Sequence, residues 1–296
     1  MHGGGRRYIE YADPAIPISL YPFADAHLGN IGCDKVALQR DLSEAAAEPA
    51  ALVMGIGDYA EYIPIHDRRF DAACIDPEVL ASCDMQSVGA ALSERVAAAF
   101  KPVAGKCIGL GFGNHEANYM KHADQGRLHE ELCAELKVPN LGYCGVLDLV
   151  FVHKPRTKRP YAILYDKPAI DSPPWVVRIG YHHGVGSGRT RGGKIGKLVM
   201  AAGVMDADII ILAHTHTQLA TPIIHIGGNE DCTRIVDRQQ LAVNTGTYLR
   251  TYRQDSTIYG EMALYDPTLI GCTPVRFHPD KRKAEVSVIA KVGRDG

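Results

Sequence analysis

IPISLYPFADAH, residues 16–27, joins a continuous apolar run to a short polar cluster, Asp25-Ala26-His27. An apolar run of this length, ended by polar residues, is typical of a buried strand. The sequence repeats this arrangement in ALVMGIGD (51–58), CIGLGFGNHE (107–116) and ADIIILAHTH (207–216). The chain is therefore expected to present polar side chains at the ends of several buried strands.

A fifth polar cluster, His182-His183-Gly184, follows the strand-like segment Trp175–Tyr181. In open α/β sheets, ligands bind at the carboxyl ends of the strands. All five clusters have this position, so residues far apart in the sequence are expected to converge at one edge of a sheet. The other four clusters are Asp25-Ala26-His27, Gly57-Asp58, Gly113-Asn114-His115-Glu116 and His214-Thr215-His216.

Helical patterns alternate with the strands through the first two-thirds of the chain. Helices are expected at Val36–Ala47, Gln86–Phe100, Asn118–Leu136 and Gly193–Ala202. Further strands are expected at Val146–His153, Tyr161–Tyr165, Gln218–His225, Gln240–Asn244, Glu261–Tyr265 and Ala284–Ile289. The pattern predicts an α/β protein. We expect one domain covering residues 1–296, because no linker, repeat or low-complexity segment interrupts the pattern.

The composition is that of an ordinary globular protein, with 46% hydrophobic and 22% charged residues in 296. The formal net charge of −2 argues against a dedicated binder of duplex DNA. The eight cysteines include no CxxC pair, which favours reduced thiols over a disulfide framework. Since neither a secretory signal nor a membrane-spanning run is visible, a cytoplasmic protein without membrane association is expected.

The clusters supply carboxylate, amide and imidazole groups, which bind divalent metals. Seven such ligands would hold two ions: Asp25, His27, Asp58, Asn114, one of His182 and His183, His214 and His216. The set contains oxygen and nitrogen donors but no thiolate, so it favours Mn²⁺, with Fe or Zn²⁺ as alternatives. Two cations that share a water molecule can supply hydroxide at neutral pH, which is the nucleophile of phosphoester hydrolysis.

This ordered set of five clusters resembles the signature of the calcineurin-like metallophosphoesterase family, and the resemblance spans residues 25–216. HGVGSGRTRGGK (183–194) and NTGTYLRTY (244–252) are similar to segments of phage and prophage-type members. The resemblance implies the family's αββα sandwich, in which two mixed β-sheets are flanked by helices. It also implies a binuclear metal centre and phosphoester hydrolysis.

The resemblance further implies a role for each ligand. Asp25, His27 and His216 would bind the first ion, and Asp58 would bridge the two ions. Asn114 and His214 would bind the second ion together with one of the two adjacent histidines. His183 is favoured there because a Gly-rich run follows it, and His182 is the alternative.

Two further residues resemble the family's catalytic groups. His115 is expected to protonate the leaving oxygen or to stabilise its developing charge. Glu61 stands three residues after Asp58, where many members carry an Asp that orients this histidine. The sequence departs from the phosphoprotein phosphatases of the family at Tyr62, because those proteins have a phosphate-gripping Arg at this position.

Arg189, Arg191 and Lys194 could replace that phosphate grip, or they could form a solvated basic loop. A phosphodiesterase acting on nucleotides or nucleic-acid ends is the favoured function, and a phosphomonoesterase is the alternative. A non-catalytic scaffold of the same fold is a third hypothesis, which the complete ligand set disfavours. A nuclease acting on long DNA would need many phosphate contacts, and the near-neutral charge disfavours it. The sequence does not indicate the oligomeric state.

Overall fold

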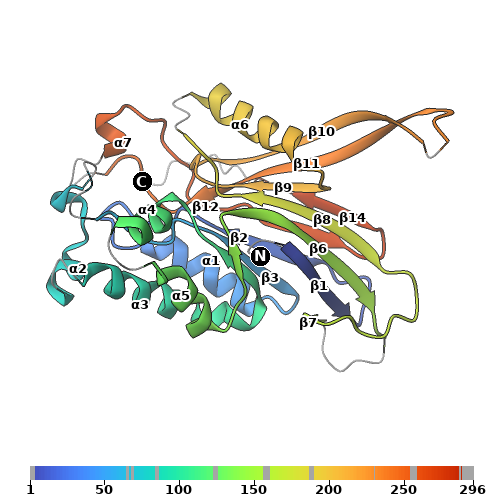
Figure 1. Ribbon diagram of the computed structural model, residues 1–296, viewed down its shortest axis with the longest axis horizontal. Coiled ribbons are helices and arrows are strands. Elements are labelled where there is room, and N and C mark those ends of the chain that lie inside the picture. Colours follow the sequence, from blue (N-terminus) through green and yellow to red (C-terminus); the bar gives the residue numbers. More distant parts are fainter. Residues whose placement is uncertain are drawn as a thin grey trace, which may run out of the picture.

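The computed structural model describes residues 4–64, 67, 70–83, 87–122, 126–155, 161–186, 190–229, 231–253, 259–286 and 288. Within these residues the chain forms two mixed β-sheets with helices on either side (Figure 1). This arrangement confirms the expected α/β class with two mixed sheets and flanking helices.

The smaller sheet has six strands in the order β14-β13-β2-β3-β4-β5. Its four neighbouring parallel strands carry three of the polar clusters at their carboxyl ends: β2 (Ile18–Phe23), β3 (Ala51–Ile56), β4 (Cys107–Gly111) and β5 (Asn140–Gly142). Two antiparallel strands, β13 (Val275–His278) and β14 (Lys283–Val286), complete the sheet beside β2.

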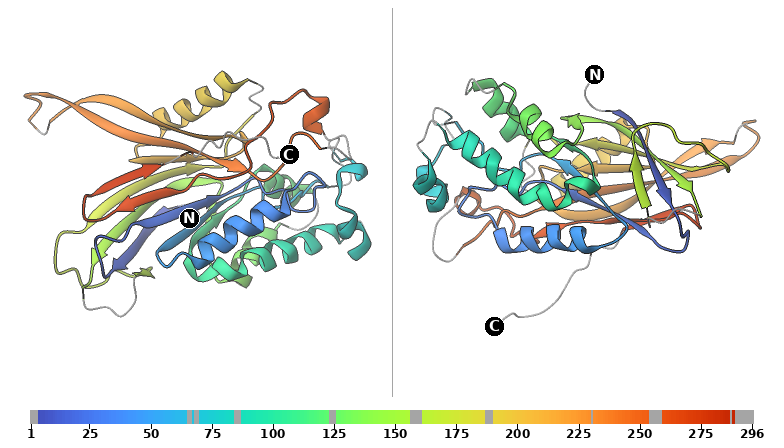
Figure 2. Two further views of the ribbon diagram at one scale, coloured as in Figure 1. Left: turned by 180° about the vertical axis from the view of Figure 1, so that it is seen from behind. Right: turned by 90° about the horizontal axis from the view of Figure 1, so that it is seen from below.

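The larger sheet has eight strands, of which seven run in the order β10-β11-β9-β8-β6-β1-β7, while β12 pairs with β11. Its strands are β1 (Gly4–Tyr11), β6 (Cys144–His153), β7 (Tyr161–Leu164), β8 (Trp175–His182), β9 (Ile209–Leu212), β10 (Gln218–Gly228), β11 (Ile235–Thr247) and β12 (Gly271–Cys272). The β10–β11 hairpin extends beyond the rest of the fold in opposite views (Figure 1 and Figure 2).

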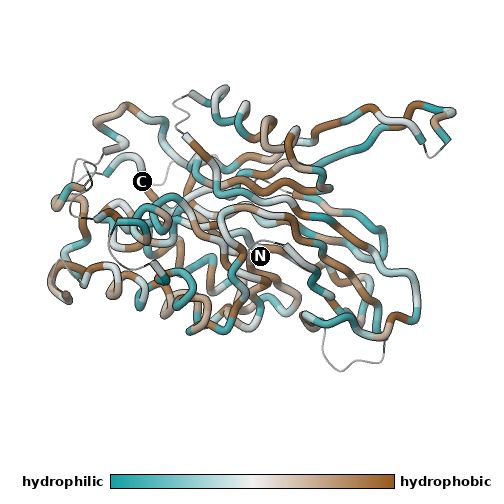
Figure 3. The backbone as a smooth tube through the Cα atoms, viewed as in Figure 1, coloured by the Kyte–Doolittle hydropathy of each residue, from teal (hydrophilic) through white to brown (hydrophobic). Residues whose placement is uncertain are grey.

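The two sheets pack face to face through one shared apolar core. Leu20 and Leu52 of the smaller sheet belong to the same buried cluster as Leu149, Ile179 and Ile211 of the larger sheet, and all five are completely buried. Successive side chains of a strand point to opposite faces, so every second residue enters this core. The apolar stretches of the tube in Figure 3 follow these central strands.

Helices cover the outer face of each sheet. α1 (Lys35–Ala47), α3 (Val88–Phe100) and α5 (Leu128–Leu136) pack on the smaller sheet through residues such as Leu42, Leu92 and Leu132. α6 (Arg191–Val204) packs on the larger sheet, where Leu198 contributes to a cluster with Ile210 and Ala242. The remaining helices are short: α2 (Pro77–Ser82), α4 (Asn114–His122), α7 (Tyr259–Met262) and the 3₁₀ turns η1 (Ala72–Cys74) and η2 (Lys101–Lys106).

The predictions of two elements are wrong. The single helix expected over Asn118–Leu136 is two helices, α4 and α5, and Gly126, a poor helix former, lies between them. The strand expected at Glu261–Tyr265 is absent from these described residues, where the chain instead forms the last part of α7 and a turn. Its alternating apolar residues, Met262 and Leu264, are 63% and 83% exposed, so no sheet buries them.

The eight cysteines, all among the described residues, form no disulfide. Cys33, Cys107 and Cys133 are buried, whereas Cys144 and Cys232 are exposed. No helix in the described part of the chain is long and apolar enough to cross a membrane.

Candidate metal centre

The loops that follow β2, β3, β4, β8 and β9 meet at one end of the two sheets. Backbone N–H groups of these loops donate to carboxylates on neighbouring loops. The N–H of His214 donates to Asp25 Oδ2 (2.8 Å), and the N–H of His115 donates to Asp58 Oδ1 (2.9 Å). These bonds join the loop after β9 to the loop after β2 and the loop after β4 to the loop after β3, and they orient the two buried aspartates.

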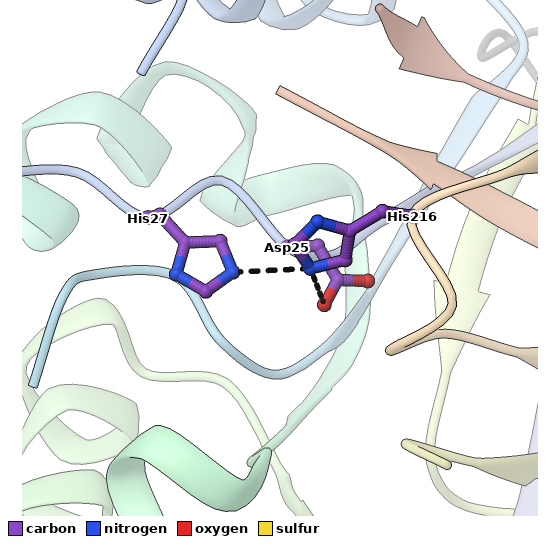
Figure 4. A group of neighbouring side chains, drawn as sticks. All are labelled: Asp25, His27 and His216. Atoms are coloured by element: carbon purple, nitrogen blue, oxygen red, sulfur yellow. Dashed lines mark hydrogen bonds and ion pairs between the residues drawn. The ribbon is translucent and has the colours of Figure 1, made fainter. Parts of the chain in front are cut away.

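The first ligand group comprises Asp25, His27 and His216 (Figure 4). Nε2 of His216 lies 3.3 Å from Nε2 of His27 and 3.3 Å from Oδ1 of Asp25. Asp25 is completely buried, and its Oδ1 accepts no hydrogen bond from the described residues. A cation fits this group, because it would satisfy a buried carboxylate oxygen and two imidazole nitrogens that face one another.

The second ligand group comprises Asp58, Asn114, His183 and His214. Nε2 of His183 lies 3.1 Å from Asp58 Oδ2 and 3.1 Å from Asn114 Oδ1. Asp58, His183 and His214 each offer a ligand atom within 4.8 Å of the others, and His27, Asp58 and His115 do the same. Asp58 therefore lies between the two candidate ligand groups.

The structure places His183, not His182, in the second ligand group. His183 is completely buried, whereas His182 is partly exposed at the end of β8. Nδ1 of His182 accepts the N–H of Gly184 (2.7 Å), and its ring packs edge-on against Tyr143. The geometry thus favours His183 of the two alternatives that the motif left open.

Hydrogen bonds select which nitrogen of each ligand histidine carries a proton. Nδ1 of His183 contacts the Ile56 carbonyl (2.7 Å), and Nε2 of His214 contacts the Gly186 carbonyl (3.0 Å). Nδ1 of His27 contacts Glu61 Oε2 at 2.9 Å. A carbonyl can only accept, so in the neutral imidazoles the proton lies on Nδ1 of His183 and on Nε2 of His214, and the opposite nitrogen of each ring is the one that a metal could use.

Glu61 supports two histidines rather than one. Its Oε2 lies 2.9 Å from Nδ1 of His27, and its Oε1 lies 3.7 Å from Nδ1 of His115. Burial alone would raise the pKa of Glu61, but the charges of His115 and His27 lower it to about 2. The sequence predicted that Glu61 orients His115. In the structure the shorter contact of Glu61 is to the candidate ligand His27.

The electrostatic field of the cluster favours positive charge. Burial lowers the pKa of a histidine, yet Asp58 raises the pKa of His183 to about 10, and Glu61 raises that of His27 to about 9. For His214 burial prevails and lowers the pKa to about 4. The buried carboxylates that hold protons on two of these imidazoles would attract a divalent cation in the same way.

Backbone strain is concentrated at the ligands. Nine non-glycine residues in the described part of the chain have a positive φ, and five of them are Asp25, His27, Asp58, His214 and His216. Each such residue costs on the order of 1–3 kcal/mol and persists where the surrounding structure enforces it. This clustering is typical of functional sites and was not visible in the sequence.

Sequence reasoning assigned no role to Glu116, which joins the loops after β3 and β4. This completely buried carboxylate accepts the backbone N–H groups of Asp58, Tyr59 and Gly113, each at 2.8 Å. Burial and the neighbouring Asp58 raise its pKa to about 7, against the effect of the three donors. The one sequence feature that could have indicated this role is the position of Glu116 directly after Asn114 and His115 in the same polar cluster.

A cavity of about 830 Å³ opens beside the cluster and is lined by ligands from both groups and by His115. Of the three basic residues that could grip phosphate, Lys194 also lines this cavity and is only 9% exposed, whereas the Arg191 side chain is exposed and faces Asp266 (3.8 Å). Arg189 lies outside the described residues.

Tyr62, the position at which the sequence departs from the phosphoprotein phosphatases, is a core residue. Its hydroxyl lies 3.1 Å from Ser93 Oγ.

No protein-family model matches this sequence, and no curated protein sequence matches it either.

Proposed function

We propose that the protein is a phosphoester hydrolase of the calcineurin-like metallophosphoesterase type, which uses two divalent metal ions. One observation carries this proposal: side chains from five strand ends gather in groups that could hold metal ions, and Asp58 lies close both to His27 and to His183 and His214. Mn²⁺ is the favoured ion, with Fe or Zn²⁺ as alternatives, because the ligands are oxygen and nitrogen donors.

Asp25, His27 and His216 would hold one ion, Asn114, His183 and His214 the other, and Asp58 would contact both. Two cations in such a site lower the pKa of a shared water molecule and neutralise phosphoryl oxygens. The protein fixes the ligands beforehand through Glu61, the Ile56 carbonyl and the Gly186 carbonyl.

His115 is the proposed proton donor to the leaving oxygen. It lines the cavity, 9% exposed, and its backbone N–H is fixed by Asp58 Oδ1. Glu61 Oε1 lies 3.7 Å from its Nδ1, on the side where it would orient the ring. A general acid in this position contributes about 10²–10⁴-fold to the rate.

The favoured substrates are phosphodiesters, among them nucleotides or nucleic-acid ends, and phosphomonoesters are the alternative. Tyr62 supports this preference, because it lies in the core where phosphoprotein phosphatases present an Arg to phosphate. A non-catalytic scaffold is disfavoured, because a site without catalysis has no need of the strained backbone at five ligands.

The test compares the Mn²⁺-loaded protein on bis-p-nitrophenyl phosphate and p-nitrophenyl phosphate, with and without a chelator. We expect hydrolysis of the diester, loss of activity with chelator, and a decrease of about 10²-fold or more in kcat for His115→Gln. His183→Gln and His182→Gln form a matched pair, of which only the first should abolish activity. Activity that survives both chelation and Asp58→Asn would overturn the proposal, and hydrolysis of the monoester alone would overturn the diester preference.

A further inference from the structure

The cavity beside the metal cluster has a second, apolar wall. This apolar wall consists of Ile75, Val79, Val88 and Leu92, which come from the segment before α2, from α2 and from α3. Ile75 is partly exposed and Val88 is 8% exposed, so these two present hydrocarbon to the cavity, whereas Val79 and Leu92 are completely buried behind them. The same continuous cavity thus touches metal ligands and hydrocarbon side chains.

The apolar wall is attached directly to the loop that carries His27. The N–H of Asp76 donates to the Gly29 carbonyl (2.8 Å), and the N–H of Ile31 donates to the Cys74 carbonyl (2.8 Å). A Cβ on Gly29 would lie 2.3 Å from a methyl carbon of Leu92, so this loop and α3 are in close contact. The wall is therefore joined to the chain at Gly29, two residues after the candidate ligand His27.

Lys194 supplies a cation on another side of the cavity. It lies in the first turn of α6 and is 9% exposed, and its ammonium group makes no hydrogen bond and no ion pair within 4 Å with any residue that the structure describes, although the charge of Asp266 acts on it from further away. By contrast, Arg250 at the same cavity is paired with Asp34, and Arg191 faces Asp266. Burial of a charged ammonium without a partner is costly, and an anionic ligand would offset that cost.

We propose that the site takes a phosphoester with one phosphate group and one apolar organic group, such as an alkyl chain or an aromatic ring. The phosphate would lie between the metal cluster and Lys194, and the apolar group would lie against the apolar wall. This inference rests on the proposed function and narrows its substrate class.

The chemistry of the wall decides between substrate classes. A sugar phosphate or a nucleic-acid end would leave hydroxyl or phosphate groups against hydrocarbon without hydrogen bonds, which is unfavourable. Among the phosphodiesters of the proposed function, the wall therefore favours those with an apolar group over nucleic-acid ends. An apolar group gains about 0.8 kcal/mol for each methylene removed from water, a factor of about three to four in affinity. A cavity of about 830 Å³ is within the usual range for a small ligand of this kind.

The first experiment measures binding and needs no hydrolysis. Isothermal titration of the Mn²⁺-loaded protein with methyl-, butyl- and hexylphosphonate should show affinity rising about three- to fourfold per buried methylene. 3-Hydroxypropylphosphonate should bind no more tightly than the methyl compound. Affinities that do not depend on chain length would overturn the inference.

Two matched pairs of variants assign the two halves of the site. Val88→Thr introduces a hydroxyl into the apolar wall and should reduce the hexyl-to-methyl affinity ratio several-fold. Val96→Thr makes the same change two turns further along α3, away from the cavity, and should leave the ratio unchanged. An unchanged ratio in Val88→Thr would contradict the placement of the apolar group.

Lys194→Met should weaken binding of every phosphonate by a similar factor and preserve the dependence on chain length. Lys197→Met is the control, because Lys197 lies one turn along α6 and donates to the Val185 carbonyl. If Lys194→Met binds all phosphonates as the unmodified protein does, the phosphate placement is wrong.

Hydrolysis separates this inference from the proposed function. Methyl, butyl and hexyl p-nitrophenyl phosphates share one leaving group and differ only in the alkyl chain. If phosphonate affinity depends on alkyl-chain length but no ester is hydrolysed, the inference is supported and the proposed function is wrong. If all three esters are hydrolysed with the same kcat/KM and phosphonate affinity does not depend on alkyl-chain length, the proposed function is supported and the inference is wrong.

Discussion

Glu116 links two of the ligand-bearing loops although it is not itself a ligand. Its carboxylate accepts three backbone N–H groups, from Asp58, Tyr59 and Gly113. Asp58 lies between the two candidate ligand groups, and Asn114 follows Gly113, so this one side chain sets the spacing between Asp58 and Asn114. A carboxylate has enough acceptor sites for three donors, whereas a carboxamide has only one oxygen.

Glu116→Gln should therefore leave at least one buried N–H without an acceptor. We expect a loss of about 1–3 kcal/mol in the free energy of unfolding, together with weaker binding of Mn²⁺. Denaturant unfolding and metal titration measure the two effects. Glu135→Gln, an exposed change on α5, is the control. A variant as stable as the control would show that Glu116 does not join the loops.

The identity of the ligand histidine could have been inferred from strand periodicity. Val177, Ile179 and Tyr181 are buried against the opposite sheet, while Val176 and Arg178 are exposed. Extending this period of two by one step predicts that His183 faces inward and His182 outward. Glu116 and the shared role of Glu61 could not be predicted, because they depend on distances between loops that are far apart in sequence.

Among the structural elements, the loops after β3 and β4 approach each other more closely than side chains allow. Gly57 has φ +95°, and a Cβ on it would lie 2.0 Å from the Gly113 nitrogen. A Cβ on Gly113 would lie 2.1 Å from Asp58 Oδ1 and 2.5 Å from His183 Cε1. The second ligand group thus requires glycine at both positions.

Gly113→Ala should displace Asp58 or His183 and lower the affinity for Mn²⁺ by at least about 10-fold. This is the typical loss of metal affinity when a contact that supports a ligand is removed. Both neighbours are fixed by hydrogen bonds, so the methyl group has no free space. Gly105→Ala is the matched control, because a Cβ on Gly105 would meet nothing within 4 Å. Titration with Mn²⁺ would contradict the argument if both variants bound the ion equally.

Three strands of the larger sheet share a charged ladder on their outer face. Asp148 of β6 is paired in register with Arg178 of β8 and with Arg6 of β1. Its carboxylate lies 2.9 Å from Arg178 Nε and 3.4 Å from Arg6 Nε. The hydrogen bond from Arg178 lowers the pKa of Asp148 below its ordinary value of 3.8.

A lowered pKa stabilises the fold at pH values above 3.8, and the contribution is lost as pH falls through the folded-state pKa. Both arginines are largely exposed, so Asp148→Asn should cost at most about 1 kcal/mol at pH 7. Unfolding at pH 7 and near pH 3 should show this difference shrinking with acidity. Asp237→Asn, on the exposed hairpin, should show no such trend, and a pH-independent difference for Asp148→Asn would refute the pairing.

The strands were more predictable than their partners in the sheet. β3 coincides with the predicted Ala51–Ile56, because its apolar run is continuous and ends at Gly57. β1 was missed, since its sequence carries Arg6, Arg7 and Glu10. Arg7 is buried nonetheless: its Nε donates to the Ile108 carbonyl of the other sheet (3.0 Å), and its guanidinium lies over the Tyr165 ring. Tertiary contacts of this kind leave no local pattern.

At the scale of the whole molecule, both sheets contribute to the candidate metal centre. The loops after β2, β3 and β4 of the smaller sheet supply Asp25, His27, Asp58 and Asn114, while the loops after β8 and β9 of the larger sheet supply His183, His214 and His216. Each ligand group therefore contains residues from both sheets. Ions bound here would connect the two halves of the shared core at one end.

Bound metal should therefore stabilise the global fold and not the loops alone. A ligand that binds only the folded state adds about 2.7 kcal/mol at a concentration about 100 times its Kd, which would raise Tm by several degrees. We expect this rise on addition of Mn²⁺, and a smaller one for Asp58→Asn, which weakens the contact shared by both ligand groups. His182→Gln leaves every ligand in place and should respond as the unmodified protein does. Equal shifts in all three proteins would place the bound Mn²⁺ elsewhere, and the two sheets would then be joined by their apolar core alone.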